Sequence, residues 1–324
     1  MFDVDISMDL VRVTEAAAIQ SSKYMGRGDK MAADQAAVDG MEKAFKYMPV
    51  RGTVVIGEGE LDEAPMLYIG QKLGVGKDYM PEMDIAVDPL DGTILIAKGL
   101  PNAIAVIAMG PKGSLLHAPD MYMKKIVVGP QAKGAIDINK SPKENMINVA
   151  KALRKDISEL TVIVQERERH NFIIDAAREV GARVKLFGEG DVAAALACGF
   201  EDTGIDILMG IGGAPEGVIA AAAIKCMGGE MQAILVPHSQ EEIDRCNKMG
   251  IDDVNKVLGI DDLVKSEDVF FAATAITECD LLKGIVFSKD EWATTHSIIM
   301  RSKTGTIRFV EAKHDLNKSK LVIE

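Results

Sequence analysis

Little in this chain points to a disulfide scaffold, a zinc site or a membrane protein. Its 324 residues include four cysteines, five histidines and one tryptophan. The cysteines lie far apart and form no Cys-x-x-Cys pair: they are Cys198, Cys226, Cys246 and Cys279. We therefore expect reduced, structural thiols. No apolar run approaches the ~18 residues that a membrane-spanning helix needs, and the first residues are acidic rather than basic, so we expect a cytoplasmic protein with no membrane partner.

Positive charge is also scarce. Lysine and arginine together number 37, against 49 aspartates and glutamates, and the net charge is −12. Nucleic-acid binding depends on a cationic face, so we expect no nucleic-acid partner. The global field would repel an anionic substrate, which bound metal ions and a few local arginine or lysine side chains must therefore attract. Hydrophobic residues make up 48% of the chain, which is long enough for two packed domains.

The most informative stretch is residues 83–99, which predicts a strand, a turn and a helix. The apolar run at residues 85–87 predicts a buried strand, and Pro89 is expected to end it at Asp88. Asp91 is expected to cap the helix that follows, because aspartate often accepts a hydrogen bond from a helix N–H group. Two carboxylates then meet at one strand tip, beside N–H groups that suit a phosphate. Asp-Pro and Asp-Gly are also ordinary turn sequences, so this stretch alone leaves both interpretations open.

Three further carboxylates occupy similar positions. Asp34 lies near the start of a predicted helix, Glu58 follows a predicted strand between two glycines, and Glu216 begins another helix. Each alone has a structural explanation, since the helix dipole favours a carboxylate near a helix start and Gly-Glu-Gly is a common loop. Together with Asp88 and Asp91 they form the oxygen-rich set that Mg2+ or Mn2+ prefers, and such ions assist phosphoryl transfer. The sequence therefore predicts a metal-dependent phosphate ester hydrolase.

The second half of the chain begins with a strand, helix and strand pattern between residues 160 and 187. This pattern predicts a βαβ unit and a mainly parallel sheet. The polar residues 129–159 before it are expected to connect two domains. We place these at residues 1–159, an N-terminal metal-binding α+β subdomain, and at residues 160–324, a C-terminal α/β subdomain that completes the substrate site.

A different interpretation comes from the motif Gly188-x-Gly190-x-x-Ala193. It matches the G-x-G-x-x-A dinucleotide fingerprint and lies between a predicted strand and a predicted helix, so an NAD-dependent enzyme is the alternative. Glu189 and Asp191 oppose this alternative, because they place negative charge where a pyrophosphate needs bare backbone.

Two arginines and a tyrosine are weaker pointers to a ligand. Arg167 and Arg169 follow the strand predicted at residues 160–164, where ligands gather in parallel sheets, but two arginines are equally well explained as a solvated face. Tyr122 lies among methionine and proline residues, where an aromatic side chain usually belongs to the core.

A series of short motifs follows along the chain: Gly-x-Gly-Asp29-Lys30-x-x-Ala-Asp34, Gly57-Glu58-Gly59, Val87-Asp88-Pro-Leu-Asp91-Gly-Thr93, Ala118-Pro-x-Met-Tyr122-Met, Arg167-x-Arg169-His170, Gly190-Asp191 and Gly213-Ala-Pro-Glu216-Gly217. Together they resemble the class II, bacterial type of fructose-1,6-bisphosphatase. The resemblance covers nearly the whole chain in the same order. The Asp-Pro-x-Asp-Gly-Thr part alone is shared by the wider lithium-sensitive sugar and inositol phosphatase superfamily.

The resemblance implies an α/β fold, a layered α-β-α-β-α sandwich of two subdomains with the active site between them. It also implies gluconeogenesis, Mg2+ or Mn2+ as cofactor, and a homo-oligomer, either a dimer or a tetramer. The metal ligands that it implies are Asp34, Glu58, Asp88, Asp91 and Glu216. The catalytic residues that it implies are Thr93, Asp91 and Glu58. The substrate contacts that it implies are Lys30, Asp91, Gly92, Thr93, Tyr122, Arg167, Glu168, Arg169, Glu189, Gly190, Asp191 and Gly213. Position 189 departs from the family, which more often has aspartate there.

The expected reaction is hydrolysis of the 1-phosphate of fructose 1,6-bisphosphate to fructose 6-phosphate and phosphate. A water attacks the phosphorus in line, Thr93 orients or deprotonates that water, and the N–H groups of the helix over residues 93–98 stabilise the transferring group. Alternatives within the class are sedoheptulose 1,7-bisphosphate, as the preferred or a second substrate, and an inositol phosphate. Outside it, the alternatives are a dehydrogenase and a noncatalytic phosphosugar sensor.

Overall fold

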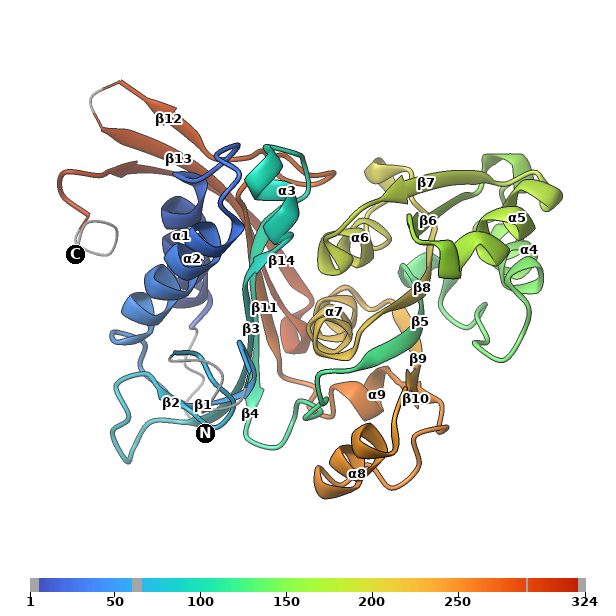
Figure 1. Cartoon of the computed structure of the whole chain (residues 1–324), viewed down its shortest axis with the longest axis horizontal. Coiled ribbons are helices and arrows are strands. Elements are labelled where there is room, and N and C mark those ends of the chain that lie inside the picture. Colours follow the sequence, from blue (N-terminus) through green and yellow to red (C-terminus); the bar gives the residue numbers. More distant parts are fainter. Residues whose placement is uncertain (1–5, 60–65, 290, 320–324) are drawn as a thin grey trace. The chain divides into compact units, whose positions relative to one another are not determined.

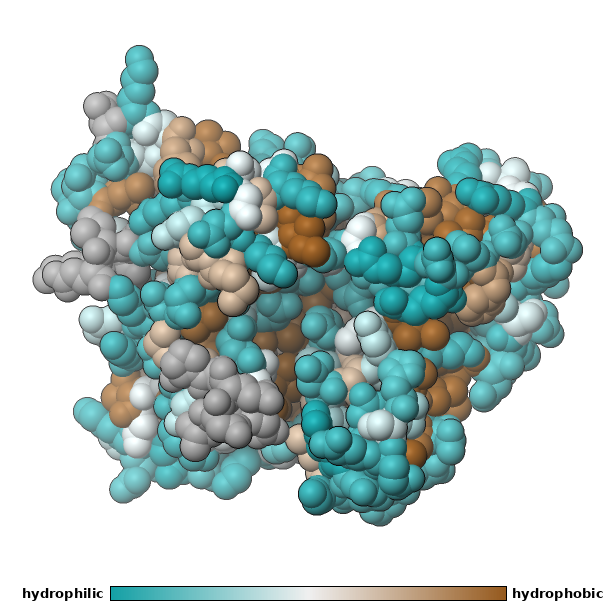
Figure 2. All heavy atoms as spheres, in the orientation of Figure 1, coloured by the Kyte–Doolittle hydropathy of each residue, from teal (hydrophilic) through white to brown (hydrophobic). Residues whose placement is uncertain are grey.

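The computed structural model (Figure 1) combines helices with two sheets, which confirms the predicted α/β class. Hydrophilic side chains cover most of the surface seen in Figure 2, in keeping with a chain of which 27% is charged. Within the described part of the chain, no helix has the length and hydrophobicity that a transmembrane segment requires. The structure describes residues 6–59, 66–289 and 291–319.

Contacts within the chain divide it into two compact units. Unit 1 combines Met1–Leu115 with Ser266–Glu324, and unit 2 is Leu116–Lys265. The boundary expected between residues 159 and 160 falls inside unit 2. The division differs from the expectation because strands near the C-terminus pair with N-terminal strands, and local sequence patterns do not reveal such a pairing.

An eight-stranded sheet forms the centre of unit 1. Its strands are β1 (Arg51–Ile56), β2 (Lys72–Leu73), β3 (Glu82–Asp91), β4 (Ile104–Pro111), β11 (Phe270–Ala275), β12 (Val286–Ser288), β13 (Trp292–Arg301) and β14 (Thr306–Asp315). They lie in the order β12-β13-β11-β4-β3-β1-β2, with β14 paired to β13. The helices of this unit are α1 (Ser7–Ser22), α2 (Lys30–Phe45) and α3 (Thr93–Lys98), with a 3-10 turn at Ser302–Thr304.

The two long helices α1 and α2 cover one face of this sheet (Figure 1). Gly40 of α2 lets the helices approach closely, because a Cβ atom there would lie 2.6 Å from a carbonyl oxygen of α1. Leu10 and Phe45 are fully buried in the core that these helices share with the sheet. The packing fixes both helices against the strands from which the candidate site residues extend.

A six-stranded sheet forms the centre of unit 2. Its strands are β5 (Tyr122–Val128), β6 (Thr161–Gln165), β7 (Arg183–Phe187), β8 (Ile207–Gly213), β9 (Glu230–Val236) and β10 (Leu258–Gly259). They lie in the order β10-β9-β5-β8-β6-β7. The helices are α4 (Pro142–Leu153), α5 (Asn171–Val180), α6 (Asp191–Ala197), α7 (Ala214–Met227), α8 (Gln240–Lys248) and α9 (Ile260–Leu263), and 3-10 turns lie at Pro130–Ala132, Ile157–Glu159, Glu168–His170 and Glu201–Thr203.

The βαβ unit predicted in the second half is present, with β6 and β7 parallel and α5 between them. A mainly parallel sheet is wrong, however. β6 also runs parallel to β8, but β5 is antiparallel to both β8 and β9, and in unit 1 only β1 and β3 are parallel among the described pairs. The prediction missed this because β5 and β9 had not been recognised as strands.

The polar stretch at residues 129–159 is not a connection between domains, and that prediction is wrong. It contains α4, which begins with a capping box: the hydroxyl of Ser141 accepts the N–H of Glu144 at 3.3 Å, and the Glu144 carboxylate accepts the N–H of Ser141 at 3.0 Å. Met146 and Val149 of this helix are buried in the core of unit 2. The segment has the polar composition of a linker because α4 buries only a narrow apolar stripe.

The C-terminal part of the chain adds two features. β13 and β14 form an antiparallel hairpin whose turn lies at residues 302–305. The segment at residues 239–268 contains α8 and α9 and also the short strand β10.

Replacing Ser141 by alanine tests the assignment of α4. The loss of the cap should lower the free energy of unfolding by about 1 kcal/mol. Denaturant titration measures this change. Lys151→Ala, on the exposed face of the same helix, is the matched control and should stay within about 0.5 kcal/mol. Equal stability of the two variants would contradict a capped helix here.

Candidate active site

The end of β3 carries two of the predicted carboxylates, Asp88 and Asp91. The pairing of β3 with β4 is interrupted after Asp88 and resumes at Asp91, so Pro89 lies in a bulge. The strand was expected to end at Asp88 but continues to Asp91. Both carboxylates lie near its end, as predicted. One oxygen of Asp88 accepts the N–H of Leu90 at 3.1 Å, and Asp91 is buried at 6% exposure.

The helix after this strand begins at Thr93, with Gly92 at the N-cap position. Gly92 has a φ of 103°, a left-handed conformation that favours glycine. The predicted capping role of Asp91 is wrong, because Asp91 remains in the strand and no side chain caps α3. Thr93 is consequently the first helical residue, where the N–H groups of the first turn have no partner within the helix. Gly99, at a φ of 67°, ends the helix.

The loop before α2 is tied to the other end of α3. The N–H groups of Gly26 and Gly28 each donate to a carbonyl of the last turn of α3, at 2.9 Å. Asp29 then caps α2 by accepting an N–H of its first turn at 3.0 Å. Lys30 is therefore the first residue of α2, and it is exposed.

Asp34 and Glu58 form a second acidic group in unit 1. Burial raises the pKa of Asp34. Burial, and then the negative charge of Asp34, raise the pKa of Glu58 to about 7. Paired carboxylates that resist ionisation suit a divalent cation, which would neutralise both. In the described ranges, however, no three or more histidine, cysteine, aspartate or glutamate side chains are grouped as they would be around a metal ion.

In unit 2, the end of β8 brings two carboxylates onto bare backbone. A Cβ atom at Gly212 would overlap the carboxylate of Asp191, and one at Gly213 would overlap that of Glu216. A side chain at either glycine would therefore displace the carboxylate that lies against it. Oε2 of Glu216 is buried and has no hydrogen-bond partner among the described residues. Burial raises the pKa of Glu216, although the positive charge of Lys125 opposes this shift.

The G-x-G-x-x-A motif lies between β7 and α6, as the alternative interpretation required. Gly190 is the N-cap of α6 at a φ of 93°, and Glu189 precedes it. Asp191 is the first residue of the helix, and Nζ of Lys125 lies 2.6 Å from its carboxylate. A charged pair therefore stands at the position where the fingerprint would hold a pyrophosphate.

Tyr122 and Arg169 lie together in unit 2. The guanidinium carbon of Arg169 lies 5.0 Å from the centre of the Tyr122 ring, which is 41% exposed. Arg169 also donates to the carbonyl of Ile211 at 2.9 and 3.2 Å and to the side chain of Gln165 at 2.9 Å. His238 packs edge-on against Tyr122, with the ring centres 5.5 Å apart.

His170 holds the turn that carries the arginines. Its Nδ1 lies 2.8 Å from the carbonyl of Gln165, and its Nε2 accepts the N–H of Ile211 at 2.8 Å. Burial lowers the pKa of His170. The ring is therefore neutral with its proton on Nδ1, because Nε2 must accept. Arg167 and Glu168 belong to the same turn and are exposed.

The predicted residues thus fall into two sets, which belong to different units. In unit 1 they are Lys30, Asp34, Glu58, Asp88, Asp91, Gly92 and Thr93, and in unit 2 they are Tyr122, Arg167, Glu168, Arg169, Glu189, Gly190, Asp191, Gly213 and Glu216. Lys125 and His238 touch these residues and were not predicted. A lysine in an unrecognised strand and a histidine in a loop give no local signal.

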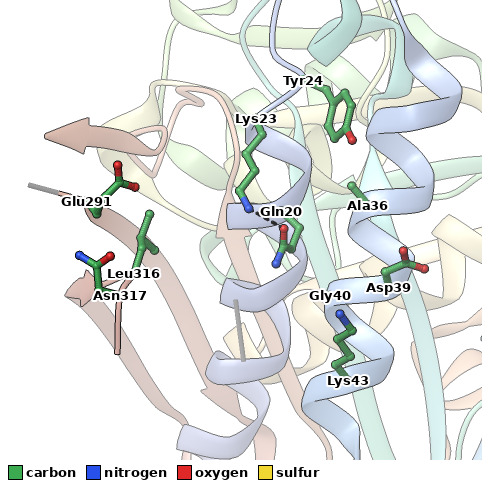
Figure 3. A pocket seen from close by; sticks show the side chains of 10 residues that line it. All are labelled: Gln20, Lys23, Tyr24, Ala36, Asp39, Gly40, Lys43, Glu291, Leu316 and Asn317. Carbon is green, nitrogen blue, oxygen red and sulfur yellow. Dashed lines mark hydrogen bonds between the residues drawn. The ribbon is translucent and has the colours of Figure 1, made fainter. Parts of the chain in front are cut away.

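A hollow of about 530 Å3 in unit 1 is separate from these residues (Figure 3). Its lining comes from α1 and the turn after it, from α2, and from the segments flanking β13 and β14: Gln20, Lys23, Tyr24, Ala36, Asp39, Gly40, Lys43, Glu291, Leu316 and Asn317. No predicted site residue lines it, so the hollow is not part of the candidate site.

Comparison with known proteins agrees with the motifs. A family profile described as bacterial fructose-1,6-bisphosphatase, glpX-encoded, matches residues 4–314. The chain is 45% identical over 327 aligned positions to fructose-1,6-bisphosphatase 1 class 2 of Escherichia coli (strain K12), covering 97% of this chain and 96% of that protein. It is 43% identical over 334 positions to D-fructose 1,6-bisphosphatase class 2/sedoheptulose 1,7-bisphosphatase of Synechococcus sp. (strain JA-2-3B'a(2-13)), covering 96% of each. The chain therefore belongs to the family of bacterial class 2 fructose-1,6-bisphosphatases, a family of metal-dependent phosphatases.

Proposed function

We propose that this protein hydrolyses the 1-phosphate of fructose 1,6-bisphosphate to give fructose 6-phosphate and phosphate, a step of gluconeogenesis. Membership of the family supports this substrate. The structural observation that carries it is the end of β3, where Asp88 and Asp91 flank a bulge and α3 begins at Thr93. Carboxylates that could hold a cation are followed directly there by the start of a helix, where N–H groups favour a phosphate.

We propose Mg2+ or Mn2+ as the cofactor. The proposed ligands are Asp34, Glu58, Asp88, Asp91 and Glu216. Two observations support the donor set: burial and a neighbouring charge hold the pKa of Glu58 at about 7, and a buried oxygen of Glu216 has no hydrogen-bond partner in the described part of the chain. When bound, such ions polarise phosphoryl oxygens and lower the pKa of a coordinated water.

The other roles fall to side chains and backbone that this chain supplies. The Thr93 hydroxyl orients the attacking water or takes its proton, and the N–H groups of the first turn of α3 stabilise charge on the phosphoryl group. Arg169, stacked on Tyr122, binds the distal phosphate. Asp191 accepts a hydrogen bond from a sugar hydroxyl. The remaining proposed substrate contacts are Lys30, Asp91, Gly92, Arg167, Glu168, Glu189, Gly190 and Gly213.

Sedoheptulose 1,7-bisphosphate is a second candidate substrate, because the Synechococcus relative is named for both bisphosphates. The NAD-dependent alternative is not proposed, because the charged pair of Asp191 and Lys125 occupies the start of α6. A homo-oligomer, either a dimer or a tetramer, is proposed from the resemblance alone.

Phosphate release from the purified protein tests this function. Fructose 1,6-bisphosphate and sedoheptulose 1,7-bisphosphate are supplied separately, with Mg2+ or Mn2+, with EDTA, and after EDTA followed by excess metal. We expect release that EDTA abolishes and metal restores. Release unaffected by EDTA would remove the metals from the mechanism, and no release from either bisphosphate would overturn the function.

Replacing Glu58 by glutamine tests the buried carboxyl group. Its folded pKa of about 7 lies above its unfolded value, so its ionisation destabilises the metal-free protein as the pH rises toward 7, and that loss persists above 7. The melting temperature of Glu58→Gln in EDTA, relative to wild type, should therefore rise between about pH 5 and pH 8. With saturating Mn2+, the wild type should instead have the higher melting temperature. The exposed Glu166→Gln is the control, and an identical pH profile for both variants would show that Glu58 ionises normally.

Thr93 separates a chemical role from a packing role. Thr93→Ser keeps the hydroxyl and should keep a substantial share of turnover, whereas Thr93→Ala should lose ~10²-fold in kcat, the scale of a positioned proton-transfer group. Steady-state kinetics at saturating metal measure both. Equal losses in the two variants would assign Thr93 to packing at the start of α3.

Arg169 decides between a bisphosphate enzyme and a general phosphatase. Arg169→Ala should lower kcat/KM on fructose 1,6-bisphosphate by about ten- to hundredfold and change hydrolysis of glycerol 2-phosphate little, because only the first substrate has a distal phosphate. Arg178→Ala, an exposed arginine of α5, controls for the loss of one positive charge. An equal loss on both substrates would place Arg169 at the reacting phosphate or in the fold.

A further inference from the structure

Lys125 is a buried lysine in the middle of β5, only 5% exposed. Its Nζ donates to the carboxylate of Asp191 at 2.6 Å and to the carbonyl of Gly213 at 3.1 Å. Lysine is almost never buried unless it is paired, because removing an ammonium from water is costly. Both partners of this ammonium belong to the set of predicted substrate contacts.

The carboxylates of Asp191 and Glu216 both lie close against glycine backbone at the end of β8. The carboxylate of Asp191 lies directly over Gly212, and that of Glu216 lies directly over Gly213. The ammonium of Lys125 therefore fixes Asp191 by an ion pair and fixes, through one carbonyl, the peptide on which Glu216 rests. One side chain from β5 connects two carboxylates that enter from α6 and α7.

We propose that Lys125 is a positioning residue for substrate and metal binding, acting through Asp191 and through the Gly213 backbone. This inference rests on the proposed function, in which Asp191 accepts a hydrogen bond from a sugar hydroxyl and Glu216 binds a metal ion. Lys125 itself contacts neither the sugar nor the metal ion. Its role is to hold one carboxylate in the orientation that accepts the hydroxyl and to hold the strand end that supports the other.

A buried ion pair alone does not require this role, since apolar residues of similar volume often replace one without loss of stability. The neighbouring Lys124 provides the contrast. It extends to the other face of β5, is half-buried, and among the described residues donates to the carbonyl of Ile138, at 2.9 Å. Of two adjacent lysines in one strand, one therefore ends on predicted site residues and the other on a loop carbonyl.

The experiment compares Lys125→Met with Lys124→Met, which removes the same charge from the same strand. In Lys125→Met we expect KM for fructose 1,6-bisphosphate to rise about tenfold with kcat changed less than about threefold. Without substrate, the Mn2+ concentration that gives half of the metal-induced rise in melting temperature should increase about tenfold. Lys124→Met should match wild type in both measurements.

A lower melting temperature in Lys125→Met with an unchanged KM and Mn2+ midpoint would overturn the proposal and leave Lys125 a structural residue. If Lys125→Met does not fold, Asp191→Asn is compared with the double variant Asp191→Asn, Lys125→Met, in which both charges are absent. The double variant should then show the higher Mn2+ midpoint, and equal midpoints would overturn the proposal. If wild type releases no phosphate from the bisphosphate, the proposed function fails, and the Mn2+ midpoint alone decides the role of Lys125.

Discussion

The constraint on which both units depend is the cost of burying carboxylates in a chain of net charge −12. A carboxylate removed from water must be protonated, paired with a cation or hydrogen-bonded. Glu58, near Asp34, has a pKa of about 7 and so stands at the edge of protonation. Asp191 is paired with Lys125, and Glu216 is left with an oxygen that has no partner in the described residues. Within the part of the chain that the structure describes, Glu58 and Glu216 have no cationic partner of this kind, and they are the two buried carboxylates that most strongly support the proposed metal ligands.

In both units, carboxylates lie close to the backbone where a strand ends in residues that break its regular pattern. In unit 1, Pro89 lies in a bulge of β3, and Gly92 turns the chain into α3 with a positive φ. In unit 2, Gly212 and Gly213 leave room for two side chains before α7 begins. Each strand end passes directly into a helix, so carboxylates and helix N–H groups are neighbours in sequence as well as in space.

That proximity explains what could be predicted from the sequence. Around Asp88 and Asp91 the strand and the helix were predicted, because glycine and proline indicate local backbone conformation, although the strand continues through a bulge at Pro89 to Asp91. The burial of Lys125 could not be predicted, because adjacent lysines normally indicate a solvated surface and burial depends on strands distant in sequence. The same limit applies to the unit boundary, to α4 in the polar stretch at residues 129–159, and to most site assignments, which came from resemblance to a family rather than from spacing.

The separation into two sets of residues bears on how relatives with different names differ. Fructose and sedoheptulose bisphosphates present the same reacting phosphate and differ in the sugar that separates it from the distal one. If unit 1 acts on the reacting phosphate, through Asp88, Asp91 and Thr93, its residues need not change between the two substrates. Discrimination would then fall on unit 2, where the buried Lys125 donates to Asp191 and Arg169 donates to the carbonyl of Ile211. Lys125 and Arg169 each donate to a carbonyl of β8, that of Gly213 and that of Ile211, so a change at the end of this strand would move the surroundings of Asp191 and Arg169 together.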